Sequence, residues 1–135
     1  MLSRVGFIKS VYWAAALVDG FVAAAMLAPR LIQPTLGIAT LPASPETRYA
    51  LSNGAALMLG WTLLLVWASL DPLKRRGVLL LTAFPVIAGL ALSTLLGVRM
   101  SYIPLSGATR VWLLQGLLVA GIAAAYRVAS NLARR

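Results

Sequence analysis

The polar residues that could carry chemistry in this chain are few, and three of them lie inside long apolar runs. Asp19 is the one acidic residue within such a run, where an unpaired charge costs several kcal/mol. Asn53 and Gln115 bring amide groups to two other runs. If the small residues of each run face inward, these three side chains share a polar pocket that opens outward. Its mouth would be formed by residues at the outer ends of the runs, namely Arg48, Tyr49, Arg99 or Arg110.

A second interpretation gives the same residues structural roles. Asp19 would then be neutral, or would accept hydrogen bonds from another helix and fix the register of a bundle. Amide groups such as those of Asn53 and Gln115 commonly hydrogen-bond between membrane helices. Arg48 with Tyr49 is an ordinary anchor at a membrane interface. The residue types alone leave both interpretations open.

The composition excludes whole classes of chemistry. The chain has no cysteine and no histidine, so it cannot use a thiolate nucleophile, imidazole catalysis or a Cys- or His-ligated metal. Its acidic residues include no pair spaced for acid–base work, and Ser106 has no neighbouring base. No glycine-rich phosphate loop occurs. We therefore expect no enzymatic activity, no catalytic residues, no cofactor and no metal site.

Hydrophobicity places the chain in a membrane. Of its 135 residues 61% are hydrophobic and 11% are charged, and the mean hydropathy is +0.88. The core of a protein of this length cannot bury so much apolar surface, so lipid must cover the rest. The net charge of +9 then fits basic residues at helix ends that contact lipid headgroups. Without a basic face carrying interleaved aromatic residues, we expect no nucleic-acid partner.

Four apolar runs predict the fold. We expect one domain over residues 1–135, an all-α integral membrane four-helix bundle with antiparallel up-down-up-down connections. Ser44, Pro45 and Glu46 form an N-cap, a first-turn proline and a first-turn acid, so the second helix should begin before its span. Asp71 and Pro72 repeat the pattern before the third helix. The spans are expected at about 11–28, 49–70, 77–97 and 110–126.

Prolines predict where regular helix stops. The connection from Pro29 to Ser44 is rich in proline, so we expect a loop there, with an interfacial turn around Leu31 to Leu36. Pro85 lies inside the third span and should kink it. The carbonyl freed near Leu81 should then be satisfied by a side chain or by water, because lipid cannot donate a hydrogen bond.

The basic residues predict the orientation. One set of helix ends holds eight of the twelve basic residues, and the other set holds four. Because the cytoplasmic side of a membrane protein is richer in Lys and Arg, both termini should be cytoplasmic, in a multi-pass protein of the cell inner membrane. The richer set comprises Arg4, Lys9, Lys74, Arg75, Arg76, Arg127, Arg134 and Arg135.

Small residues recur at every fourth position in each run. Such stripes let helices approach closely in lipid, where hydrophobicity drives little association. We expect them to mark either contacts within the bundle or the face of a homodimer. The stripes are Ala16, Gly20, Ala24 and Ala28; Ser52, Ala56 and Gly60; Gly89, Ser93 and Gly97; and Gly116, Ala120 and Ala124.

Several segments resemble a group of uncharacterised prokaryotic four-helix integral membrane proteins. They are Tyr12-Trp13, Val18-Asp19, Arg48-Tyr49-Ala50, Leu57-Met58-Leu59-Gly60-Trp61-Thr62, Trp67-Ala68 and Arg75-Arg76-Gly77-Val78-Leu79-Leu80-Leu81-Thr82. The resemblance covers mainly the second and third helices. It implies the membrane fold and makes Asp19 a stronger candidate, but it implies no activity.

Two function classes follow from these residues. We expect a non-enzymatic bundle that binds a partner protein or a small hydrophobic ligand within the membrane, because the connections are too short for a catalytic domain. The alternative is a proton-coupled transporter of small cations that acts as a dimer through Asp19. The partners expected are the lipid bilayer and either a second copy of the chain or a membrane partner protein.

Overall fold

The chain is mostly helical in the part that the computed structural model describes, which is residues 2–38, 42 and 44–134. No strand occurs in those residues, so the predicted all-α class is confirmed. In that part of the chain, four helical segments are long and apolar enough to cross a membrane. They are α1 (Leu2–Leu27), α3 (Pro45–Leu70), the segment Gly77–Arg99 and α6 (Leu105–Ala133).

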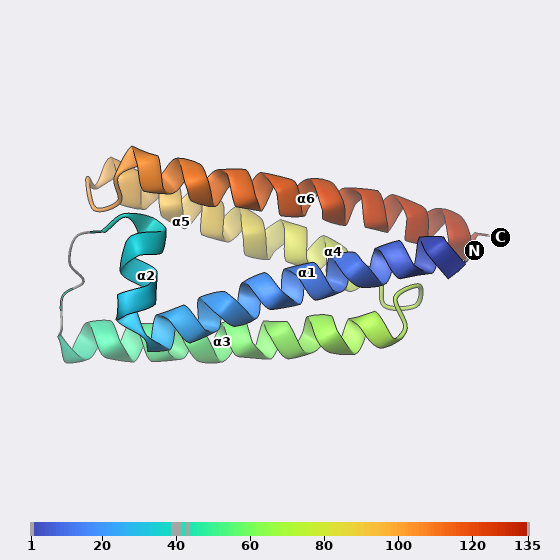
Figure 1. Ribbon diagram of the computed structural model, residues 1–135, viewed down its shortest axis with the longest axis horizontal. Helices are drawn as coiled ribbons and strands as arrows, with labels where there is room; N and C mark the ends of the chain where they lie inside the picture. Colours follow the sequence, from blue (N-terminus) through green and yellow to red (C-terminus); the bar gives the residue numbers. More distant parts are fainter. Residues whose placement is uncertain (1, 39–41, 43, 135) are drawn as a thin grey trace.

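The long helices lie side by side, and the connections gather at two opposite ends (Figure 1). Both chain ends and the turn after α3 lie at one end of the molecule. The other end holds α2 (Pro29–Leu36) and the turn that leads into α6. Two helices, α1 and α6, extend well past the predicted spans, because no proline interrupts the residues that flank those spans within the helices. The third, α3, begins before its span, as the pattern at Ser44 predicted.

The third segment is broken in its middle, as Pro85 predicted. It consists of α4 (Gly77–Leu81), the wider turn η1 (Thr82–Ile87) and α5 (Ala88–Arg99). Phe84 leaves the helical region with φ −139° and ψ 106°. The proline ring disfavours a helical conformation for the residue before it, which places the break at Phe84. The predicted partner of the Leu81 carbonyl stays a prediction.

The connection after α1 contains a helix where a loop with one turn was expected. The first helix stops at Leu27, and α2 begins at Pro29, a first-turn position that needs no backbone donor. Gly37 ends α2 in the left-handed region at φ 67°. Ile38 then packs with Ile103 and Ala108, so α2 is held across one end of the bundle (Figure 1).

The main core lies toward the end that carries the termini. Its largest members are Tyr12 and Ile8 of α1, Leu65 of α3, Leu79 of α4 and Ile122 of α6. Many large apolar side chains outside this core are exposed, such as those of Leu17, Leu57, Leu63, Phe84, Leu113 and Leu117. Apolar side chains therefore cover the outside of the bundle as well as filling its core.

The turn after α3 corrects one prediction. Asp71 is the C-cap that follows α3, and Arg76 precedes the first residue of α4, so Asp71 is not the N-cap of the third helix. Its carboxylate instead pairs with Lys74 Nζ at 3.4 Å. The residues between Asp71 and α4 form turns, so Asp71 does not directly precede the helix as an N-cap does.

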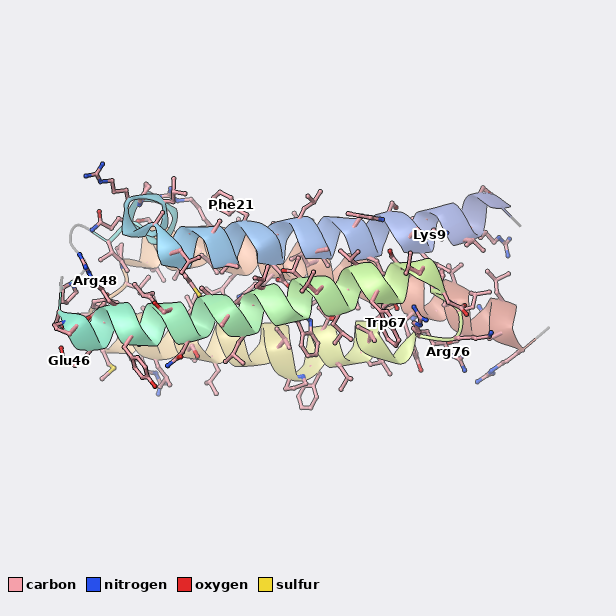
Figure 2. The ribbon with its side chains drawn as sticks, turned by 90° about the horizontal axis from the view of Figure 1, so that it is seen from below. Lys9, Phe21, Glu46, Arg48, Trp67 and Arg76 are labelled. Carbon is pink, nitrogen blue, oxygen red and sulfur yellow. The ribbon has the colours of Figure 1, made fainter. Side chains whose placement is uncertain are left out.

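Tyr12 and Trp67 hold that turn against the bundle. The Tyr12 hydroxyl donates to the Arg75 carbonyl at 2.9 Å. The Arg75 guanidinium lies 3.7 Å above the Trp67 ring and also donates to the Trp67 carbonyl. Figure 2 shows Trp67 and Arg76 close to one another at this end, with Lys9 of α1 nearby. The basic turn is thus fixed to both α1 and α3.

The small-residue stripes do not all face neighbouring helices. Ala16 is buried, and a side chain added at Gly20 would contact Thr62, so this part of the α1 stripe lies inside the bundle. A side chain added at Gly89 or Gly116 would meet nothing within 4 Å. The same holds for Gly60. The expectation of contacts within the bundle is therefore wrong for these three exposed positions, while a homodimer face there stays a prediction.

Candidate functional site

A groove runs between α1 and α3, and small residues create it. Its volume is about 410 Å³. Ala23 and Ala55 are buried at its floor, while Ala24 and Ala56 are exposed along it. Since none of these side chains extends beyond Cβ, the two helices leave an apolar hollow on their outer face. The complete lining is Gly20, Ala23, Ala24, Leu27, Ser52, Ala55, Ala56 and Leu59.

A smaller polar-ended cavity of about 250 Å³ adjoins this groove. It shares Leu27 and Ser52 with the groove and adds Met26, Leu51 and Arg48. Arg48 stands at the start of α3, on the side of that helix that faces α1 and α2 (Figure 2). The two hollows therefore form one path along α3, with a guanidinium at its end.

The start of α3 is defined by the capping pattern predicted from the sequence. The Ser44 hydroxyl accepts a hydrogen bond of 3.2 Å from the Thr47 backbone N–H, and Pro45 occupies the first turn. This cap fixes the residue at which the helix begins, and so fixes the side of the helix on which Arg48 lies. One turn later, Ser52 lies on the same face as Arg48 because residues four apart are neighbours on a helix.

Asp19 is buried inside the bundle. It is 8% exposed and lies on the α1 face that also carries the buried residues Tyr12, Ala15 and Ala23. Its Oδ2 atom has no hydrogen-bond partner among the described residues. Asp19 lines neither of the two hollows described above. It is enclosed by helices and lacks a cationic partner in the part of the chain that the structure describes.

The other predicted site residues differ in how far they are buried. Gln115 is half-buried on α6, and its Oε1 atom also lacks a partner among the described residues. Asn53 is exposed on α3, and Tyr49 is 72% exposed. Of the five predicted residues, Arg48 alone contributes to the path between α1 and α3. A shared pocket for Asp19 and Gln115 stays a prediction.

Sequence reasoning identified part of the groove without recognising it as a site. Ser52 and Ala56 belong to a predicted small-residue stripe, which was interpreted as a contact surface for a neighbouring helix. In the structure they are exposed and form one wall of the hollow. The residues contributed by α1, such as Met26 and Leu27, gave no signal because an apolar residue at the end of a span is ordinary.

The groove offers no ligands for a metal ion. Among the described residues, no group of three His, Cys, Asp or Glu side chains lies close enough to hold one. What the groove can do chemically is to bind an apolar segment against alanines and place a polar end beside Arg48 and Ser52.

Comparisons with known proteins give no match, so a function has to be argued from the structure. No protein family, curated protein or solved structure matches this chain. The resemblance to the group of four-helix membrane proteins therefore stays a prediction.

Proposed function

We propose that the protein is a multi-pass membrane protein whose four long helices cross the bilayer as an antiparallel up-down-up-down bundle. The shortest of them, Gly77–Arg99, has 23 residues and a length of about 35 Å if fully helical, against a bilayer core of about 30 Å. The exposed leucines and phenylalanines would face lipid. The axis of the bundle would lie roughly along the bilayer normal, with α2 at an interface.

We propose that both termini lie in the cytoplasm and that the membrane is the cell inner membrane. The end of the molecule that carries the termini also carries the basic turn with Lys74 and Arg76 (Figure 1). That end holds most of the positive charge, which supports the cytoplasmic assignment. Arg48 and α2 would then lie at the outer interface.

Within the membrane, we propose that the protein binds a small hydrophobic ligand in the groove between α1 and α3. The observation that carries this proposal is the groove itself, a hollow of about 410 Å³ lined by small residues. Its volume lies in the range of small-molecule sites, roughly 300–1,000 Å³. Its lining carries no catalytic group, so binding without chemistry is the simplest use of it. A helix of a partner protein is the competing occupant.

Photolabelling in lipid nanodiscs tests this proposal. A neutral diacylglycerol with a photoreactive diazirine in one acyl chain should label the segments 20–27 and 52–59, mapped by peptide mass spectrometry. Ala56→Leu should suppress that labelling because the larger side chain fills the groove. Ala123→Leu, an equal change at an exposed position of α6, should leave it unchanged. Equal labelling of the wild type and the Ala56→Leu variant would remove the proposal.

Cation transport through Asp19 is the second candidate function. The buried Oδ2 atom without a hydrogen-bond partner favours it, because such an oxygen can take up a proton or a cation. A coupling carboxylate must be reached by water or by the substrate during the cycle. Asp19 is enclosed by the helices, which is why we place transport second.

A further inference from the structure

We propose that the groove between α1 and α3 binds one acidic glycerophospholipid, with the phosphate at Arg48 and one acyl chain along the alanines. This inference rests on the proposed function and names its ligand class. It follows from the order of polar and apolar groups along the groove, from the length of the groove and from the charge at its end.

The lining changes from charged to polar to apolar along one face of α3. Arg48 comes first, and the hydroxyl of Ser52 lies one turn further along. Ala55, Ala56 and Leu59 continue the same face. A glycerophospholipid has the same order of groups, namely an anionic phosphate, ester carbonyls and an apolar chain. Ser52 can donate to an ester carbonyl, and the alanines can contact the chain.

The length of the groove fits one leaflet. From Arg48 to Leu59 the helix rises about 16 Å. Half of a bilayer core is about 15 Å thick. A lipid whose phosphate sits at the outer interface therefore has its acyl chain beside α3 over the whole length of the groove. The chain needs no change of direction to fill it.

Arg48 is free to bind an anion. The side-chain carboxylates of the chain are those of Asp19, Glu46 and Asp71. Among the described residues the salt bridge present joins Lys74 to Asp71, so Arg48 pairs with none of them. A guanidinium binds phosphate through two parallel N–H groups, which gives a planar and specific contact.

Charge argues against a second copy of the chain in this groove. Each copy carries a net charge of +9, and Glu46 is its sole acidic side chain in the segment from Pro29 to Leu59. A parallel partner helix docked along the groove would bring a second Arg48 toward the first. An acidic lipid neutralises the guanidinium, whereas a second copy repels it.

The test compares two probes with the same diazirine-bearing acyl chain in phosphatidylcholine nanodiscs, one a phosphatidylglycerol and the other the neutral diacylglycerol. We expect the phosphatidylglycerol to label segments 20–27 and 52–59 about fivefold more, the effect of one arginine on an anionic headgroup. Arg48→Gln should reduce that labelling to the level of the diacylglycerol and leave the diacylglycerol labelling unchanged. Arg110→Gln removes the same charge at an exposed position of α6 and should keep the preference.

Each outcome separates the lipid inference from the proposed function. Equal labelling by the two probes, or a preference that survives in Arg48→Gln, would overturn the acidic-lipid site while ligand binding stands. If Arg110→Gln loses the preference for phosphatidylglycerol as Arg48→Gln does, general surface charge attracts the lipid. That result would also overturn the site. Because the chain has no cysteine, Ala56→Cys gives a single thiol. Disulfide-linked dimers of that variant, with no lipid labelling, would assign the groove to a second copy instead.

Discussion

Trp61 Nε1 donates a hydrogen bond of 3.2 Å to the Thr82 hydroxyl, which in turn donates at 2.8 Å to the Val78 carbonyl. Thr82 is the first residue of the wider turn around Pro85. The bond therefore joins α3 to the third segment just where that segment is broken. In a membrane, such a bond has no competition from water, so the break is held in one position by a neighbouring helix.

Replacement of Trp61 by phenylalanine should destabilise the bundle by about 1 kcal/mol. The substitution keeps an aromatic ring but removes the donor to Thr82, and one interhelical hydrogen bond in a membrane protein contributes about that much. The free energy of unfolding can be measured in mixed micelles with rising dodecyl sulfate. Trp13→Phe is the matched control because Trp13 is exposed and has no hydrogen bond among the described residues. Equal stability of the two variants would contradict the prediction.

Gly97 and Gly89 should respond in opposite ways to alanine. An added Cβ at Gly97 would lie 2.6 Å from Ile103 Cδ1 and 2.9 Å from its Cγ1. Ile103 is packed against Ile38 and Ala108, so it cannot move freely and we expect a loss of roughly 1–2 kcal/mol. Gly89→Ala meets nothing within 4 Å and should cost nothing. Unfolding of both variants in the same micelles checks the pair, and a harmless Gly97→Ala would show that the packing there is loose.

Helix starts and breaks could be predicted where a residue acts on the backbone within one turn of its own position. The Ser44 cap and the break near Pro85 depend on local chemistry, and both predictions are confirmed. The Asp71 cap failed because the same residue pattern can open a helix or pair its carboxylate with a nearby lysine. Which of these occurs depends on the conformation of the whole turn, which is tied down by Tyr12 and Trp67 from other helices.

The site could be predicted less well than the fold, for a similar reason. Small residues at every fourth position show that something approaches a helix closely, but not whether it is a neighbouring helix, lipid or a ligand. Ala16 and Ala24 lie in one stripe, yet Ala16 is buried in the core and Ala24 is exposed in the groove. The difference depends on which side chains of the neighbouring helices lie beside each position, and the α1 sequence does not contain that information.

The proposed orientation predicts that a reporter fused to the C-terminus is active in the cytoplasm. A green fluorescent protein fusion should fluoresce, and an alkaline phosphatase fusion should be inactive. The physical reason is the excess of Lys and Arg at the end of the bundle that carries the termini. As a control, phosphatase placed after Pro42, between α2 and α3 at the opposite end, should be active. Phosphatase activity at the C-terminus would reverse the orientation and place Arg48 at the cytoplasmic interface.

Asp19→Asn distinguishes the binding function from the transport function. The amide keeps the size of the carboxyl group and much of its hydrogen-bonding capacity, but it cannot exchange a proton. Because Asp19 is buried with no cationic partner among the described residues, we expect the variant to fold with a change of at most about 1–2 kcal/mol. Diacylglycerol labelling of the groove should be unchanged, since Asp19 does not line it. If the protein instead carries cations, the folded variant should lose proton-linked flux that the wild type shows in reconstituted vesicles. Wild-type flux of a small cation that disappears in Asp19→Asn would therefore replace ligand binding with transport as the function of this bundle.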